Sequence, residues 1–219
     1  MNRLLFCLSL GVASFAALPA GAVVAVSSVG GVAVPQTALL VQVANEKEVE
    51  AAKAFVDRMA QAGIGFLGNE ALTEAQRKAE FRKLLNSSFD MDTIGRFALG
   101  RNWRTATPAQ KAEYQKLFKA MIVSVYSRRF SDYKGEKLEV GSARVDGNND
   151  VVVSSSIVPA NGEKVQVDWR VRGKGGSYKV VDILVAGVSM ALTQRSDFDS
   201  VIQRGGGNVE ALLEHLRKQ

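Results

Sequence analysis

The feature that most constrains the fold of this chain is a double change in hydrophobic period. Between residues 46 and 134, apolar side chains recur three or four positions apart, which is typical of amphipathic helices. After Gly135 the period falls to two, and an apolar face alternates with polar residues at Val165, Val167, Trp169 and Val171. A helical pattern returns near residue 196. Helices, then strands, then helices predict an α+β domain in which helices cover one face of a sheet.

Two capping boxes mark helix starts within the first helical region. Thr73 is followed three residues later by Gln76, and Thr107 by Gln110. In such a box each side chain satisfies a backbone N–H at the first turn. Pro108 suits the first helical position because that residue has no helical hydrogen bond to donate. The sequence therefore predicts helices from residues 74 and 108, the second of which we expect to end near residue 134.

Further helices are predicted before, between and after these two. A first amphipathic helix begins at Glu46, and a short one occupies Asp90 to Asn102. Near the C-terminus, Ser196 is expected to cap a helix that stops at Gly205, and Asn208 to cap a last one.

The strand region predicts an antiparallel sheet. Turn sequences rich in Gly and Asn separate its apolar runs at residues 146–149, 160–162 and 173–176. Short turns of this composition join neighbouring strands as hairpins. The expected strands are Lys137 to Val145, Val151 to Val158, Val165 to Val171 and Tyr178 to Val185.

The N-terminus reads as a secretory signal peptide over residues 1–22. Arg3 supplies a positive charge, residues 4–18 are apolar, and a small-residue cleavage site ends at Ala22. An uncleaved anchor is the alternative. Residues 23–45 are expected to form a disordered linker, followed by one domain over residues 46–217.

Candidate catalytic groups are few. Cys7, the single cysteine, lies in the expected signal peptide, and His215, the single histidine, lies one turn from the C-terminus. By alternation Asp168 falls on the polar face of its strand, so Asp182 is the best carboxylate for an enzyme hypothesis. The basic residues lack the interleaved aromatic side chains typical of nucleic-acid binding. We expect no catalytic residue, no metal, no cofactor and no nucleic-acid partner.

Two stretches resemble a known family. One is Leu99-Gly100-Arg101-Asn102-Trp103, which leads into the Thr107 helix, and the other is residues 182–189, followed by Arg195, Phe198 and Ile202. Together they resemble the Mla-pathway periplasmic lipid-binding proteins, the toluene-tolerance family, which includes hopanoid-associated relatives. The resemblance spans roughly residues 46 to 216. It implies a curved, NTF2-like antiparallel sheet covered by helices that enclose an apolar cavity.

The resemblance also implies a function. A protein of this family is expected to be a soluble periplasmic carrier, an auxiliary component of an ABC transporter, that holds phospholipid tails without covalent chemistry. Its expected partners are an MCE-domain subunit of the inner-membrane transporter and an outer-membrane lipoprotein–porin complex, with transient contact to a membrane surface. A hopanoid or another apolar lipid is an alternative cargo. A non-lipid envelope adaptor with a solid core is a second alternative, because the apolar pattern alone also fits a plain core.

Candidate lipid-contacting residues follow from the apolar faces and the resemblance. Strand alternation favours Val181 and Ile183 on the cavity face over Val180 and Leu184. The full set of expected cavity or mouth residues is Phe97, Trp103, Phe118, Met121, Ile122, Val125, Val167, Trp169, Val181, Ile183 and Val188.

Overall fold

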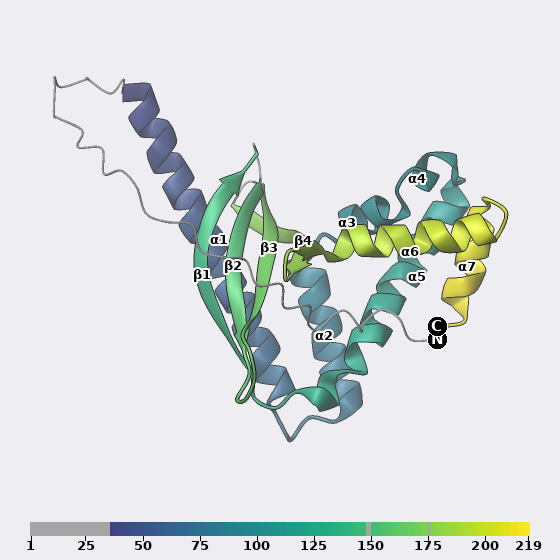
Figure 1. Ribbon diagram of the computed structural model, residues 1–219, viewed down its shortest axis with the longest axis horizontal. Coiled ribbons are helices and arrows are strands. Elements are labelled where there is room, and N and C mark those ends of the chain that lie inside the picture. The colour runs from purple at the N-terminus through teal and green to yellow at the C-terminus, as the bar shows by residue number, and fades with distance from the viewer. Residues whose placement is uncertain (1–35, 148–149, 175) are drawn as a thin grey trace, which may run out of the picture. The chain divides into compact units, whose positions relative to one another are not determined.

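Helices precede and follow a single sheet in the computed structural model, which describes residues 36–147, 150–174 and 176–219 (Figure 1). The expected signal peptide and residues 23–35 lie outside the described residues. The helices are α1 (Gln36–Leu67), α2 (Glu74–Ser88), α3 (Met91–Leu99), α4 (Asn102–Thr105), α5 (Pro108–Ser127), the short 3-10 helix η1 (Phe130–Asp132), α6 (Met190–Arg204) and α7 (Val209–Arg217). The strands are β1 (Lys137–Asp146), β2 (Asp150–Val158), β3 (Val165–Lys174), β4 (Ser177–Val185) and β5 (Val188–Ser189).

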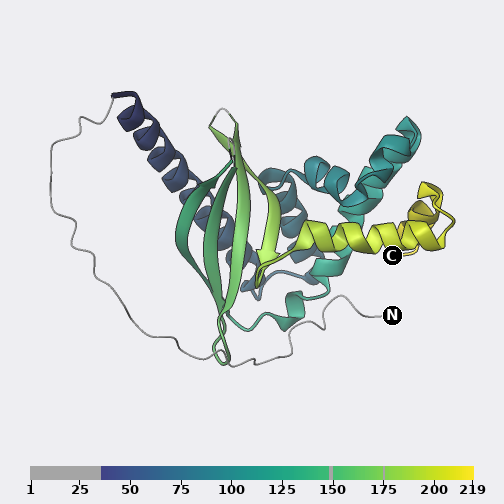
Figure 2. The ribbon, with the colours of Figure 1, turned by 45° about the horizontal axis from the view of Figure 1, so that its top comes forward.

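The strands form an antiparallel meander in the order β1-β2-β3-β4-β5 within the described residues. This arrangement confirms the predicted α+β class and the antiparallel sheet. Consecutive strands lie side by side in the sheet, as Figure 2 shows. Because side chains alternate across a strand, the register places one apolar set on a single face of the sheet. Its buried members are Val151, Val153, Val171 and Val180.

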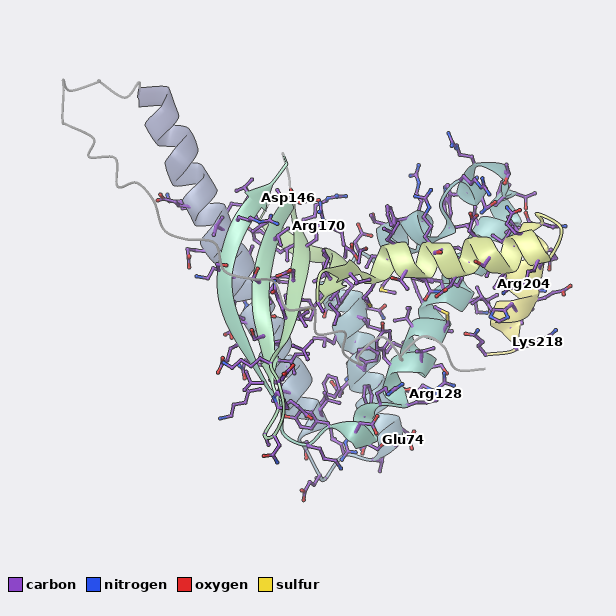
Figure 3. All side chains as sticks on the ribbon, in the orientation of Figure 1. Glu74, Arg128, Asp146, Arg170, Arg204 and Lys218 are labelled. Atoms are coloured by element: carbon purple, nitrogen blue, oxygen red, sulfur yellow. The ribbon has the colours of Figure 1, made fainter. Side chains whose placement is uncertain are left out.

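Helix α1 packs on this apolar face, which we call the α1 face. Ala52, Val56 and Met59 of the helix are buried against the valines of the sheet. The opposite face carries charged residues, and we call it the charged face. There Asp150 accepts two hydrogen bonds from Arg172, at 2.7 and 3.0 Å, and Asp146 lies 2.7 Å from Arg170 (Figure 3). Asp168 lies on the same face, bonded to the amide of Gln166.

A second core forms among the helices alone. Tyr114 and Phe118 of α5 pack against Phe198 of α6, with ring centroids 6.0 and 6.2 Å apart respectively. The Tyr114 hydroxyl donates to the carbonyl of Gly95 in α3 at 2.8 Å. Leu212 and Leu213 of α7, both fully buried, complete this core.

The predicted helix starts are confirmed in four cases. Both capping boxes, at Thr73 and Thr107, have both of their hydrogen bonds. Asp90 caps α3 by accepting from the Thr93 N–H, and Asn208 caps α7.

Helix α1 begins ten residues before the expected domain start, within the range we had expected to be a linker. The helix expected over residues 90–102 is split at Gly100, whose φ of +59° is incompatible with a right-handed helix. Helix α5 ends at Ser127, earlier than expected.

Two sequence expectations near the C-terminus were wrong. Helix α6 begins at Met190 and is capped by Ser189, whereas we had expected Ser196 to cap it. In β4 a bulge shifts the register, so that Val180 pairs with Val171 while Ile183 pairs with Trp169. Val180 and Ile183 therefore share the α1 face, and Val181 is the extra residue, because a bulge breaks the simple alternation. The expectation that Val181 and Ile183 share one face was thus wrong.

Candidate functional site

The molecule has two apolar cores, and α2 lies between them. Leu85 of this helix is buried in the helical core, whereas its neighbour Leu84 packs against the sheet core. Phe89, just after α2, packs against both cores. In Figure 1 the helix stands between the sheet and α5. Apolar side chains that belong fully to neither core therefore lie along the border between the two.

A strip of partly covered apolar side chains runs along α5, at the edge of the helical core. Phe118 and Met121 are buried in that core on one flank of the helix, and Val123 and Ser127 are buried on a second flank. At 3.6 residues per turn, Ile122 and Tyr126 fall between these two flanks. Ile122 is half-buried and Tyr126 is 45% exposed.

Tyr126 is exposed to solvent, although burial raises the pKa of its hydroxyl above the usual value. Together with Ile122 it forms a partly uncovered apolar surface between the two buried flanks of α5. We call Ile122 and Tyr126, with the half-buried Val125 beside them, the α5 strip.

The α1 face of the sheet offers a matching set of half-buried apolar residues. Trp169 and Ile183 pair across β3 and β4, and both pack at the edge of the sheet core. The Trp169 indole N–H donates to the Ser155 hydroxyl at 2.9 Å, and this hydroxyl donates to the carbonyl of Val167 at 2.9 Å. The polar edge of the indole is thereby satisfied by protein, so that its ring can face an apolar neighbour without the cost of an unpaired N–H.

The predicted lipid-contacting residues fall into five groups. Ile122 and Val125 lie on the α5 strip, and Trp169 and Ile183 on the α1 face. Phe118, Met121, Val167 and Val181 are almost fully buried. Trp103 is half-buried, with Arg96 and Lys111 against its ring at 5.9 and 5.5 Å. The last two, which are exposed, are Phe97 and Val188.

The sequence did not single out Tyr126 or Phe89 as candidate lipid-contacting residues. Both were visible as apolar positions in helical patterns, but their position at the border depends on which flanks of α2 and α5 find partners. Those contacts are tertiary and cannot be read from the sequence.

Asp182, the carboxylate singled out for an enzyme hypothesis, is engaged in a structural contact. It accepts hydrogen bonds from the Ser189 hydroxyl at 2.6 Å and from the Ala191 N–H at 3.1 Å. A carboxylate at the first turn of a helix satisfies free N–H groups and is favoured by the helix dipole. Asp182 therefore fastens the start of α6 to β4.

Within residues 36–147, 150–174 and 176–219, no group of three or more His, Cys, Asp or Glu side chains is arranged to hold a metal ion. No helix in the same part of the chain combines the length and apolarity needed to cross a bilayer.

The fold and the border between the cores define an α+β protein with one open antiparallel sheet whose apolar face is covered by helices. The chain belongs to the MlaC protein family, whose model matches residues 57–218.

Relatives of known sequence and structure agree with this assignment. The chain is 24% identical over 133 residues to the toluene tolerance protein Ttg2D of Pseudomonas putida, covering 60% of this chain and 62% of that protein. It is 25% identical over 133 residues to the intermembrane phospholipid transport system binding protein MlaC of Haemophilus influenzae, covering 59% and 61%. The match thus spans about three fifths of the length of these curated relatives.

A solved structure is similar over more of the chain. The phospholipid-binding protein from Ralstonia solanacearum, in complex with a phospholipid, superposes with a TM-score of 0.65 and 26% identity. The similarity covers 76% of this chain and 95% of that one.

Proposed function

We propose that this chain binds phospholipid non-covalently and holds its acyl tails between the α5 strip and the α1 face of the sheet. The observation that carries the proposal is the partly uncovered apolar surface that Tyr126 and Ile122 form between two buried flanks of α5. Ile122 on the same helix and Trp169 and Ile183 on the sheet supply further apolar wall. The Ralstonia protein, similar over most of this chain, was solved with a phospholipid bound.

The physical need for such a site follows from the hydrophobic effect. Keeping one methylene from water is worth about 0.8 kcal/mol, so the two tails of a phospholipid amount to on the order of 25 kcal/mol. A lipid cannot cross an aqueous compartment with both tails exposed. A protein recess of similar apolarity replaces the bilayer, so that transfer between membrane and carrier needs no covalent step.

We further propose that the chain is an exported, periplasmic carrier and not an enzyme. In this role it would move phospholipid between an inner-membrane ABC transporter with an MCE-domain subunit and an outer-membrane lipoprotein–porin complex. The name of the Haemophilus relative, a binding protein of an intermembrane phospholipid transport system, supports this proposal. So do the predicted signal peptide and the structural engagement of Asp182.

Native mass spectrometry of the purified protein, followed by organic extraction, tests the cargo. We expect a near-stoichiometric phospholipid that disappears on denaturation. A hopanoid would retain the mechanism and replace the cargo. A lipid-free protein that also takes up no lipid from vesicles would refute the proposal and favour an adaptor with a solid core.

Variants at Tyr126 test the position of the tails. Tyr126→Asp places a charge in the proposed recess and is expected to abolish lipid retention, because an ion next to acyl chains is costly. Tyr126→Phe preserves the apolar ring and is expected to retain the lipid. Circular dichroism of both variants checks the fold. Equal lipid content in folded Tyr126→Asp and Tyr126→Phe proteins would exclude Tyr126 from the site.

A further inference from the structure

A group of exposed apolar side chains lies at the start of α6 and the end of α3. Leu192 is 56% exposed, Val188 55% and Phe97 44%. Val188 lies just before α6 and Leu192 lies in its first turn. One turn beyond Leu192, the Arg195 guanidinium lies over the Phe97 ring, 5.7 Å from its centroid. We call these four residues the α6 patch.

Arg195 is held in place by its surroundings without an ionic partner. A Cβ at Gly100 would come within 2.7 Å of the Arg195 Nε, so the guanidinium packs directly against the glycine backbone. Its other neighbour is the apolar Phe97 ring. No carboxylate among the described residues forms a salt bridge with Arg195. A positioned, half-buried guanidinium with free donors is suited to a phosphate.

In the described part of the chain, none of the carboxylates near the patch in sequence forms a salt bridge with Arg195. Asp197, two residues beyond Arg195, has a buried Oδ2 without a hydrogen-bond partner among the described residues, and burial raises its pKa. Asp199, one turn beyond Arg195, accepts from Asn102 at 3.0 Å and lies 3.4 Å from Arg101. Asp182 is engaged with Ser189 and Ala191 at the start of α6. The positive charge of Arg195 is therefore left for an external anion.

We propose that the α6 patch docks the protein on a bilayer that carries anionic lipids. Leu192, Val188 and Phe97 would insert between headgroups, and Arg195 would contact a lipid phosphate. Apolar side chains combined with a cation are the usual signature of interfacial membrane binding. The formal net charge is +6 for the whole chain and +5 without the expected signal peptide, which holds Arg3 and no acidic residue, and this charge favours the same surface. This docking does not depend on which lipid the proposed recess holds.

Vesicle flotation tests the docking. The probes are vesicles of phosphatidylcholine alone and of phosphatidylcholine with phosphatidylglycerol. We expect the protein to float with the second kind at low salt and to be released by salt, which screens exposed charges. Leu192→Asp is expected to weaken this binding roughly tenfold, because it replaces an inserted apolar side chain by an anion. Val145→Asp, a change at an exposed valine on β1, is the matched control and is expected to bind normally.

Arg195→Gln tests the phosphate contact. It is expected to abolish the preference for anionic vesicles, while Arg58→Gln, which removes the same charge from an exposed position on α1, leaves the preference intact. If Arg195→Gln fails to fold, the comparison of Leu192→Asp with Val145→Asp still tests whether the α6 patch binds the bilayer. Absence of flotation by the wild-type protein at low salt, or equal losses in Leu192→Asp and Val145→Asp, would overturn the proposal.

Lipid content separates this proposal from the proposed function. Leu192→Asp is expected to retain its co-purified lipid while losing vesicle binding. Normal vesicle binding by Leu192→Asp, combined with a failure to pass lipid to a protein acceptor, would overturn membrane docking and assign the patch to a protein partner.

Discussion

The corner between α6 and α7 allows a sharp test of packing, because two backbones approach there at Gly205. A Cβ placed on Gly205 would lie 2.1 Å from the Cβ of Ala211. The φ of Gly205, −87°, is ordinary for any L-residue, so backbone strain is not the reason for glycine. We therefore predict that Gly205→Ala is destabilising through this one contact.

The size of the effect follows from the geometry. Overpacking costs about 1–3 kcal/mol, and we expect about 3 kcal/mol because neither Cβ can rotate away from the other. Ala211→Gly alone should cost about 1 kcal/mol through helix propensity. In the double variant the clash is gone, so its total loss should be about 1 kcal/mol instead of about 4.

Urea unfolding followed by far-ultraviolet circular dichroism, applied to the wild type, both single variants and the double variant, measures this cycle. The expected coupling between the two positions is about 3 kcal/mol, far outside the ~0.5 kcal/mol expected of independent sites. If the losses of the single variants simply add up in the double variant, the α6–α7 contact is not the reason for glycine at this position.

Two further predictions concern stability. Thr107→Ala removes the side-chain half of the capping box of α5 and should lower the free energy of unfolding by about 1 kcal/mol in the same urea assay, whereas Thr107→Ser should preserve it. Burial tends to raise the pKa of Asp90, but hydrogen bonds from Thr93 and the charges of Arg172 and Lys179 outweigh it and hold this pKa below its usual value. The folded-state pKa is thus below the unfolded one, so Asp90 contributes stability that is present above about pH 4 and lost as the pH falls. Asp90→Asn, which can still cap α3, should therefore make unfolding less sensitive to acid, and an unchanged pH profile would contradict this account.

Local signals in the sequence predicted much of the fold. The boxes at Thr73 and Thr107 and the alternation around Trp169 each depend on residues a few positions apart, so they can be read without a structure. The start of α6 could not be read in this way. Ser189 caps the helix together with Asp182, which lies on a neighbouring strand, and that pairing exists only in the folded chain.

The site was less predictable than the fold. Apolar patterns at Phe118 and at Ile122 look alike along the sequence, but the first is buried in the helical core and the second lies between two buried flanks. The bulge in β4 likewise reverses the expected parity of Val180 and Val181. Which apolar face is filled by neighbours and which stays open is decided by the packing of α2, α5 and the sheet.

Trp169, whose indole N–H is bonded to Ser155, can serve as an intrinsic fluorescent reporter of the proposed recess. The chain has two tryptophans, and the structure gives them different surroundings. Trp103 has Arg96 and Lys111 against its ring, whereas Trp169 has its N–H fixed and its ring beside Ile183 on the α1 face. Acyl chains carrying bromine in the proposed recess would quench the emission of Trp169 and leave that of Trp103. Lipid entry and exit could then be followed in real time by fluorescence without attaching a dye.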